Sequence, residues 1–172
     1  MKLPVILILC CIGTFSFPKN GEWPTKASTS FSSNFGEYRD GHFHMGLDIK
    51  TRGTTGHEVF ASHSGYISRM VSNYTGYGKA IYIKTKTGNE VVYAHLEKFT
   101  PVLEKVWRLQ QAKRRSYKVN ANFSSREFPV EKGDLIGYSG NTGSSYAPHI
   151  HYEYRSSNSE PLNPLEFAFN LS

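Results

Sequence analysis

Histidine side chains lie close in sequence to a carboxylate or to another histidine in short segments that could hold a metal ion. The first segment is His44-Met45-Gly46-Leu47-Asp48. On a straight strand, residues four apart are separated by about 13 Å, whereas two zinc ligands each lie about 2 Å from the ion. The chain must therefore bend or coil between His44 and Asp48, and Gly46 gives it the freedom to do so. Taken alone, this spacing favours an ordinary surface pair.

The second segment is Pro148-His149-Ile150-His151. Alternate residues of a strand face the same side, so His149 and His151 point together, about 6 to 7 Å apart along the chain. One of them can bind a metal ion while the other stands beside it. Pro148 stiffens the entry to this strand, and the Gly/Ser/Thr loop at 140–145 can expose the edge of a cleft.

A third histidine, His95, ends the apolar segment Tyr93-Ala94-His95-Leu96. A single histidine on a strand is more often structural than catalytic. This residue therefore gains a functional interpretation only in combination with the other two segments.

Apolar runs of strand length alternate with glycine-containing turns along most of the chain. The 15 Gly, 11 Tyr and 11 Phe among 172 residues favour strands joined by tight turns. The pattern predicts a mainly β fold with a single antiparallel-sheet domain. The expected strands are Gly46 to Ile49, Glu58 to Phe60, Gly65 to Val71, Lys79 to Lys84, Glu90 to His95 and Ile150 to Arg155, with shorter strands between Phe128 and Tyr138.

The strand pattern breaks between about Lys98 and Glu127. Apolar residues at helical intervals predict a helix from Pro101 to about Lys113. From Tyr117 to Phe123, apolar and polar residues alternate, which predicts a half-exposed strand.

The first 16 residues are typical of an export signal. Lys2 supplies a positive start, and the apolar run from Leu3 to Phe15 is too short to span a bilayer. We expect residues 1–16 to be a signal peptide or a membrane anchor, residues 17–33 a lead-in or linker, and residues 34–172 the domain itself. The protein is then exported to the periplasm, the cell envelope or the medium. Cys10 and Cys11 both lie in the first segment, so the domain is expected to contain no disulfide.

The net charge of +6 and the pI near 9.3 favour contact with polyanions. An exported protein meets anionic wall polymers or a membrane surface first. The sequence shows no motif for nucleic-acid binding, so we expect no nucleic-acid partner. We expect a monomer.

Taken together, the three segments resemble the lysostaphin/LytM-like zinc endopeptidases, in which His-x-x-x-Asp is followed by Tyr-x-His and then by His-x-His. The resemblance includes Gly76-Tyr77-Gly78 and the glycine-rich stretch at 133–143, and it covers about Asn34 to Pro164. Several motifs in the right order make it specific. It implies a domain of the duplicated hybrid type with an open groove.

Position by position, the resemblance implies that His44, Asp48 and His151 bind one Zn²⁺ per chain and that His95 and His149 are catalytic. Two neutral imidazoles and one carboxylate leave the ion positively charged with an open coordination position. The implied function is hydrolysis of peptide cross-links in bacterial peptidoglycan by a metal-activated water. The two catalytic histidines would move protons or stabilise the oxyanion, and the sequence does not divide these roles between them.

Two other functions remain open. One is a LytM-like module that is not catalytic and binds or activates another cell-wall hydrolase. Such relatives have typically lost metal ligands, whereas this chain has all of them. A D-Ala-D-Ala carboxypeptidase is less favoured, because such enzymes use a different His-to-Asp spacing.

The remaining histidines and one tyrosine have weaker assignments. Tyr38 precedes His44 by a short loop and is expected to reach the cleft, where it could hydrogen-bond the oxyanion. His42 alternates with His44 but is expected to be a rim residue. His57 and His63 match no functional position, so both are expected at the surface.

The segment from about 98 to 127 replaces a connection that is shorter in the compact family pattern, so we interpret it as an insertion. Because it follows His95 directly, we expect it to form one wall of the groove. Arg114, Arg115 and Lys118 would then face anionic wall material there. A solvated basic helix is an equally good interpretation.

Overall fold

The structure, a computed structural model, describes residues 20–169. The expected signal peptide or anchor at 1–16 lies outside these residues. Within the described part, no helix is both long and apolar enough to cross a lipid bilayer.

The described chain consists mostly of strands. The longer ones are β4 (Leu47–Lys50), β6 (Gly65–Ser72), β7 (Lys79–Thr85), β8 (Glu90–Phe99), β9 (Val119–Asn122), β11 (Leu135–Ser139) and β12 (His149–Arg155). The shorter ones are β1 (Phe31–Ser33), β2 (Tyr38–Arg39), β3 (His42–Phe43), β5 (Glu58–Phe60), β10 (Pro129–Val130) and β13 (Pro161–Leu162). The two helices in this part are α1 (Pro101–Arg114) and α2 (Pro164–Phe167).

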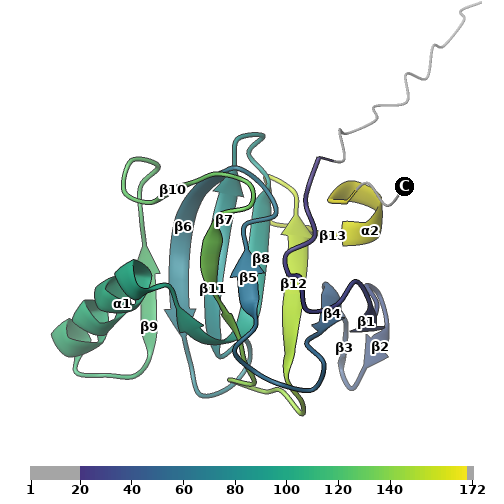
Figure 1. Cartoon of the computed structure of the whole chain (residues 1–172), viewed down its shortest axis with the longest axis horizontal. Coiled ribbons are helices and arrows are strands. Elements are labelled where there is room, and N and C mark those ends of the chain that lie inside the picture. Colours follow the sequence, from purple (N-terminus) through teal and green to yellow (C-terminus); the bar gives the residue numbers. More distant parts are fainter. Residues whose placement is uncertain (1–19, 170–172) are drawn as a thin grey trace, which may run out of the picture.

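One antiparallel sheet of order β1-β4-β12-β8-β7-β6-β10 forms the centre of the molecule (Figure 1). Off this path, β9 pairs with β6, β13 with β12, and β11 with both β5 and β8, while β2 and β3 form a separate hairpin. The predicted mainly β, antiparallel fold is confirmed.

The two faces of the sheet have different surroundings because side chains alternate along each strand. Tyr93 and Tyr152 pair across β8 and β12 and point into the main hydrophobic core. Their neighbours Val92 and Ala94 point to the other face, where they belong to a smaller apolar cluster. His151 pairs with Ala94 and therefore lies on this second face. The candidate site is built there.

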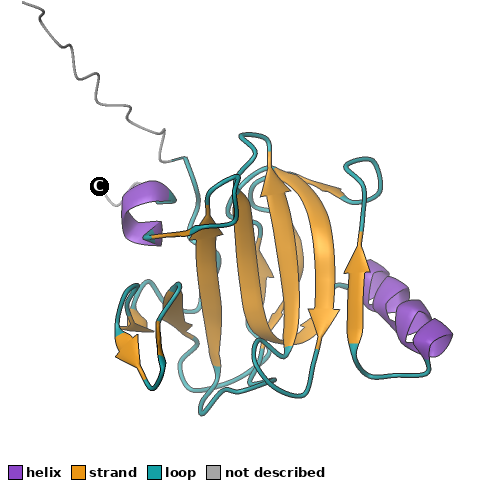
Figure 2. Ribbon diagram, turned by 180° about the vertical axis from the view of Figure 1, so that it is seen from behind, coloured by secondary structure: helices purple, strands orange, loops and turns teal. Residues whose placement is uncertain are grey.

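The insertion contains the predicted helix and strand. Pro101 lies in the first turn of α1, and Arg115 ends the helix with a left-handed backbone, φ 49°. Leu103 and Trp107 are buried, and the indole N–H of Trp107 donates to the hydroxyl of Ser72 at 2.9 Å. β9 extends the sheet next to β6, on the side away from β4 and β12 (Figure 2).

Residues 20–33, for which a lead-in or linker was expected, run along the domain and pack against it. The backbone N–H of Glu22 donates to the carbonyl of Ser62 at 2.9 Å, and the ring of Trp23 lies 5.0 Å from that of Phe169. Farther along, β1 pairs with β4. The two aromatic residues Trp23 and Phe31 anchor a segment whose Ser, Thr and Lys content suggested a linker.

Candidate metal centre

His44, Asp48 and His151 form a compact buried cluster. The Nε2 atom of His44 lies 3.0 Å from Nδ1 of His151 and 3.1 Å from Oδ1 of Asp48. Nδ1 of His151 lies 2.9 Å from the same carboxylate oxygen. Each residue offers one ligand atom, and these atoms all lie within 4.8 Å of one another. The structure thus brings together the three residues expected to bind zinc.

Strand pairing and a close backbone contact position this cluster. His151 on β12 lies opposite Asp48 on β4, so both side chains emerge on the same face. Residues 44–46 precede β4 outside any strand, and the chain bends there as expected. A Cβ on Gly46 would lie 2.2 Å from the carbonyl oxygen of Tyr152. Glycine is therefore needed here for space, and its backbone is not in the left-handed region.

Hydrogen bonds on the outer side of each imidazole determine which nitrogen faces the cluster. Nδ1 of His44 lies 2.7 Å from the carbonyl oxygen of Asn34, and Nε2 of His151 lies 2.8 Å from a carboxylate oxygen of Glu153. Both partners accept, so each ring in its neutral form turns its unprotonated nitrogen toward Asp48. Three lone-pair donors that face one another repel unless a cation lies between them. Two imidazoles and one carboxylate with an open position suit Zn²⁺.

Glu153 anchors the outer side of the cluster. It is fully buried, accepts a hydrogen bond from the hydroxyl of Tyr77 and pairs with Arg155, whose Nε lies 2.6 Å away. Burial alone would raise the pKa of Glu153, but the contacts with His151 and Arg155 outweigh it and lower the pKa. Burial and the adjacent carboxylate raise the pKa of Tyr77, which keeps its hydroxyl a neutral donor. A carboxylate behind a ligating histidine fixes the ring and increases its basicity.

Arg39 holds the second oxygen of the Asp48 carboxylate. Its guanidinium forms an ion pair with Oδ2 of Asp48 and donates to the hydroxyl of Ser33 at 2.9 Å, which leaves Oδ1 for the cluster. Burial raises the pKa of Asp48, but the close contacts of its carboxylate with His149, His151 and His44 outweigh this and hold the pKa well below its usual range. The carboxylate is therefore ionised and can act as a ligand.

His95 and His149 stand beside the ligand cluster. Their ring centroids are 4.7 Å apart, and Nε2 of His149 lies 3.3 Å from Oδ1 of Asp48. Nδ1 of His95 donates to the carbonyl of Thr142 at 2.8 Å, and Nδ1 of His149 donates to that of Ala147 at 2.8 Å. Burial lowers the pKa of His95 to about 4, so its ring is neutral near pH 7. Its Nε2 is then an available proton acceptor.

Gly76-Tyr77-Gly78 and the glycine-rich stretch at 133–143 contact each other beside His95. His95 lies in β8 and has a left-handed backbone with φ 59°. The register between β7 and β8 shifts next to it. The hydroxyl of Thr142 donates to the carbonyl of Leu96 at 2.8 Å and accepts from the backbone N–H after Gly78 at 2.9 Å. A Cβ on Gly143 would lie 2.3 Å from the backbone nitrogen of Gly78. This close backbone contact fixes the carbonyl that orients His95.

A groove of about 860 Å³ opens over the histidines. The β2–β3 hairpin forms one side with Phe43, and the loop at 144–147 contributes the fully exposed Tyr146. No described residue between 98 and 127 lines this groove. The expectation that the insertion forms a groove wall is therefore wrong, because Leu103 and Trp107 attach α1 to the sheet near β6 and β9 instead.

The hairpin also carries Tyr38 and His42. The Tyr38 side chain is 74% exposed, and its ring lies 5.8 Å from that of Phe43. Tyr38 is not among the described residues that line the groove, whereas Phe43 is. His42 is exposed and lines the groove, as expected for a rim residue.

His57 and His63, which were both expected at the surface, differ in how deeply they are buried. His57 is half-buried, and its Nε2 lies 2.8 Å from the hydroxyl of Thr54. For His63 the surface interpretation is wrong, because the residue is only 5% exposed. Its Nδ1 lies 2.9 Å from the hydroxyl of Ser62, and burial lowers its pKa to about 4.

The sequence interpretation did not identify Arg39 or Glu153, and it included Thr142 in the stretch at 133–143 without giving it a role. A signal for Glu153 existed, because it follows His151 by two residues on the same strand and must share its face. Arg39 and Thr142 act from loops and short strands that only tertiary structure brings to the cluster, so no local spacing reveals them.

Comparison with known proteins identifies the family. The model of peptidase family M23 matches residues 42–164. The DD-carboxypeptidase/endopeptidase Mpg of Neisseria meningitidis serogroup B is 34% identical over 125 residues, which are 73% of this chain and 23% of Mpg. This chain therefore aligns with about a quarter of that relative.

Solved structures of similar fold include two proteins with moderate sequence identity to this chain. The catalytic domain of the antimicrobial peptidase lysostaphin from Staphylococcus simulans is 25% identical, with a TM-score of 0.57 over 80% of this chain and 90% of that domain. Csd3 of Helicobacter pylori is 27% identical, with a TM-score of 0.55 over 87% of this chain and 33% of Csd3. The match to the family model covers most of the chain and contains all five histidine and aspartate residues of the site. The chain therefore belongs to peptidase family M23, and its resemblance to the lysostaphin/LytM-like peptidases is confirmed.

Proposed function

We propose that this protein is a zinc-dependent metalloendopeptidase that hydrolyses peptide cross-links of bacterial peptidoglycan. The observation that carries the proposal is the arrangement of two kinds of histidine. His44 and His151 turn lone pairs toward Asp48, while His95 and His149 stand beside this cluster and remain outside it. Structural zinc sites use four protein ligands, whereas three ligands beside unliganded bases suit catalysis.

The chain's own residues supply the groups for proton transfer. Zinc held by His44, Asp48 and His151 would supply a Lewis acid and an activated water. His95 can accept a proton at Nε2, because its Nδ1–H is held by the Thr142 carbonyl. The ring of His149 is oriented by the Ala147 carbonyl in the same way. The two adjacent imidazoles can therefore take up a proton and deliver one to the leaving amine.

The names of the relatives indicate the type of reaction but do not identify the peptide bond that is cut. Mpg is named as both a DD-carboxypeptidase and an endopeptidase. A relative named for both activities does not favour one of them over the other for this chain. We favour internal cleavage because the groove is open and has side chains of the hairpin and of the 144–147 loop along it. A peptide can then continue in both directions from the metal.

Digestion of purified peptidoglycan tests the proposal. The zinc-loaded full chain is incubated with cross-linked sacculi and with isolated cross-linked dimers, and the products are identified by mass spectrometry. Endopeptidase activity converts dimers to monomers, whereas carboxypeptidase activity removes one terminal residue. The His149→Ala variant is the matched control, because the groove residues around it are unchanged. A zinc-loaded protein that releases no product from either substrate would contradict catalysis and support the non-catalytic module.

A further inference from the structure

The net positive charge of the protein is concentrated in the insertion. Residues 98–127 hold eight Lys and Arg side chains against two Glu, an excess of six. The whole chain has the same excess, a net charge of +6. The rest of the chain consequently carries 12 basic and 12 acidic side chains. Such a distribution produces a local positive field instead of a general one.

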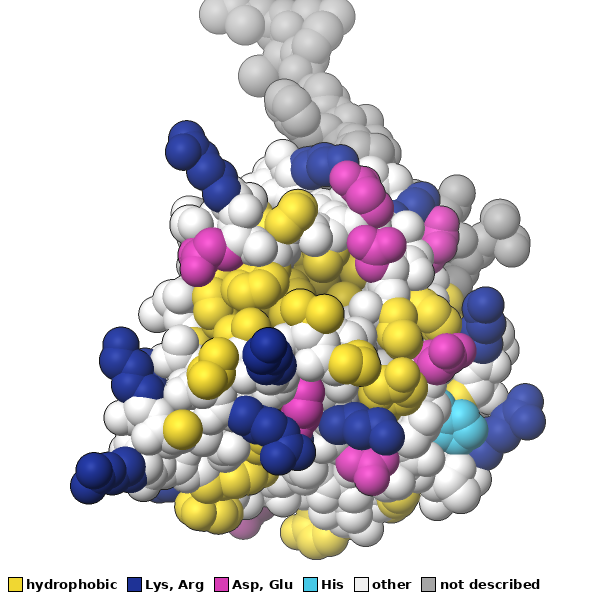
Figure 3. All heavy atoms as spheres, turned by 60° about the vertical axis from the view of Figure 1, so that its left-hand side comes forward, with side chains coloured by type: hydrophobic (Ala, Val, Ile, Leu, Met, Phe, Trp, Pro, Cys, Tyr) yellow, Lys and Arg dark blue, Asp and Glu magenta, His cyan; other side chains and the backbone are white. Residues whose placement is uncertain are grey.

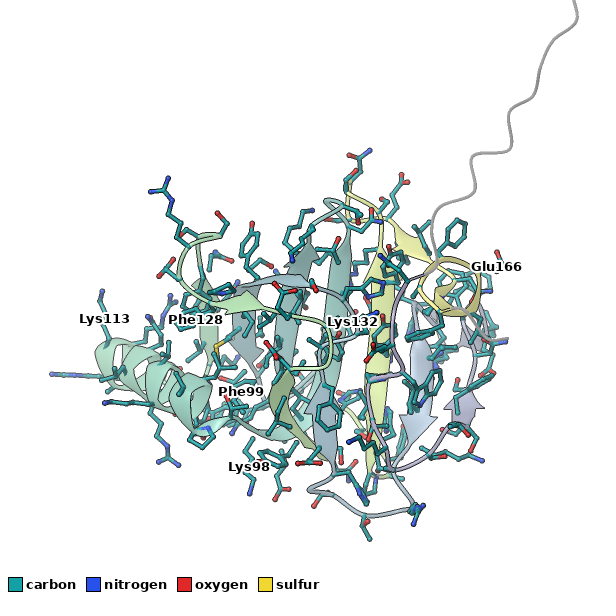
Figure 4. The ribbon with its side chains drawn as sticks, turned by 45° about the horizontal axis from the view of Figure 1, so that its top comes forward. Lys98, Phe99, Lys113, Phe128, Lys132 and Glu166 are labelled. Atoms are coloured by element: carbon teal, nitrogen blue, oxygen red, sulfur yellow. The ribbon has the colours of Figure 1, made fainter. Side chains whose placement is uncertain are left out.

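Exposed cations cover α1 and the turn that follows it. Lys105, Lys113, Arg115 and Lys118 are all exposed. Figure 4 shows Lys113 at the end of α1, on the opposite side of the molecule from Glu166 of α2. Figure 3, which brings the α1 side forward, shows Lys and Arg side chains, with some Asp and Glu, around exposed apolar surface. Because no described insertion residue lines the groove, this positive surface is separate from the candidate site.

The same outer surface exposes large apolar side chains. Val102 is 68% and Leu109 62% exposed, and together with Lys105 they lie on one stripe of α1 at positions i, i+3 and i+7. Leu103 and Trp107 occupy the opposite, buried side. At the start of the stripe, a hollow of about 390 Å³ lies between α1 and β10; its lining is mostly apolar but includes Glu127 and Asp134.

We propose that the outer face of α1 docks the protein on an anionic lipid bilayer surface. Lipid headgroups attract the clustered Lys and Arg side chains, and the headgroup boundary accepts exposed apolar side chains such as Val102 and Leu109. A soluble polyanion would use the cations alone and leave these two side chains in water. Docking through α1 leaves the groove accessible, so this inference does not depend on the proposed peptidase activity.

Vesicle binding of the full chain tests the charge component. Sedimentation is measured with vesicles of phosphatidylcholine alone and of equimolar phosphatidylcholine and phosphatidylglycerol, across a series of salt concentrations. In the variant with four of the eight insertion cations replaced, we expect binding to the anionic vesicles to weaken roughly 100-fold and to depend less steeply on salt. This variant is Lys105→Gln, Lys113→Gln, Arg115→Gln and Lys118→Gln. The matched control removes four cations elsewhere and should change binding less than about 3-fold: Lys26→Gln, Lys84→Gln, Lys86→Gln and Lys132→Gln.

A second variant distinguishes the bilayer from a soluble polyanion. Replacing Val102 and Leu109 with Ser should weaken binding to the anionic vesicles roughly 10-fold and leave binding to soluble polyphosphate unchanged. Normal affinity of this variant for vesicles would overturn the lipid assignment and identify a polyanion surface. Equal losses in the insertion variant and the matched control would overturn the docking face itself. Circular dichroism of each variant verifies that it is folded.

Discussion

The Nε2 atom of the buried His151 lies 2.8 Å from the carboxylate of Glu153, two residues farther along β12. This contact orients His151 so that Nδ1 faces Asp48. The carboxylate also increases the electron density on the ring, because Glu153 remains ionised in its contacts with Tyr77 and Arg155.

Glu153→Gln should weaken zinc binding about 10-fold to 100-fold. The amide keeps the size and one acceptor oxygen but loses the negative charge that supports His151. Zinc affinity is measured by competition with a chromogenic chelator, which does not depend on activity. The exposed Glu160→Gln is the control and should keep wild-type affinity. Unchanged zinc affinity in Glu153→Gln would mean that Glu153 only fills space.

Each of the three cluster residues should be required for metal binding. We expect about one zinc per chain in the wild type and a large loss of zinc in His44→Ala, Asp48→Ala and His151→Ala, because two remaining ligands hold zinc poorly. Metal content is measured after dialysis against a weak chelator. A variant that keeps a full equivalent of zinc would remove that residue from the ligand set.

His95→Ala and His149→Ala should keep zinc but lose turnover. Both residues lie beside the cluster, and positioned proton-transfer groups contribute about 10²-fold to 10⁴-fold to rates. Metal content and peptidoglycan cleavage are measured on the same samples. Near-normal cleavage by either variant would show that a single histidine is sufficient.

The stability of the protein should fall between neutral and mildly acidic pH because of His63. Burial, with a smaller contribution from Lys132, lowers the pKa of His63 to about 4, whereas an unfolded imidazole has a pKa of about 6.5. The unfolded chain therefore binds more protons between these values. The contribution of neutral His63 to the free energy of unfolding is complete above about pH 6.5 and is lost as the pH falls toward 4. This change is on the order of 3 kcal/mol.

His63→Gln tests this assignment because glutamine does not titrate. Urea unfolding is compared at about pH 7 and about pH 4.5. We expect the free energy of unfolding to fall less with acidification in the variant than in the wild type. Equal losses in both proteins would assign the pH dependence to other groups, of which the buried His95 is the first candidate.

Much of the centre could be predicted from sequence because its residues have local spacing signals. Strand alternation placed His149 and His151 on one face, and the order of the motifs indicated that His44, Asp48 and His95 converge. The residues whose location was predicted wrongly depend on long-range packing. His63 is buried because Tyr154 and the N-terminal segment cover it, with the ring of Tyr154 5.3 Å away.

The location of the insertion also required the structure. Its sequence correctly indicated a helix and a strand, but chain proximity to His95 suggested the wrong neighbour. The pairing of β9 with β6 and the bond from Trp107 to Ser72 determine its place. Ser72 carries no sequence signal that points to Trp107, 35 residues away.

Thr142→Val should slow cleavage without removing zinc. The hydroxyl of Thr142 bridges the Leu96 carbonyl and the backbone N–H of Lys79, while its own carbonyl accepts from His95. Valine keeps the shape but leaves both bridged groups without this partner, which costs about 1 to 3 kcal/mol for each buried group. The loop at 142–143 should then hold its carbonyl less firmly against His95.

Three measurements on this variant separate a positioning role from a purely structural one. We expect kcat to fall roughly 10-fold or more with little change in KM, because misplacement affects proton transfer more than substrate binding. Zinc affinity should match the wild type, since no ligand contacts Thr142. Thr142→Ser keeps the hydroxyl and should restore most of the activity. If Thr142→Ser were as slow as Thr142→Val, the methyl group and its packing, and not the hydroxyl bridge, would be what positions His95.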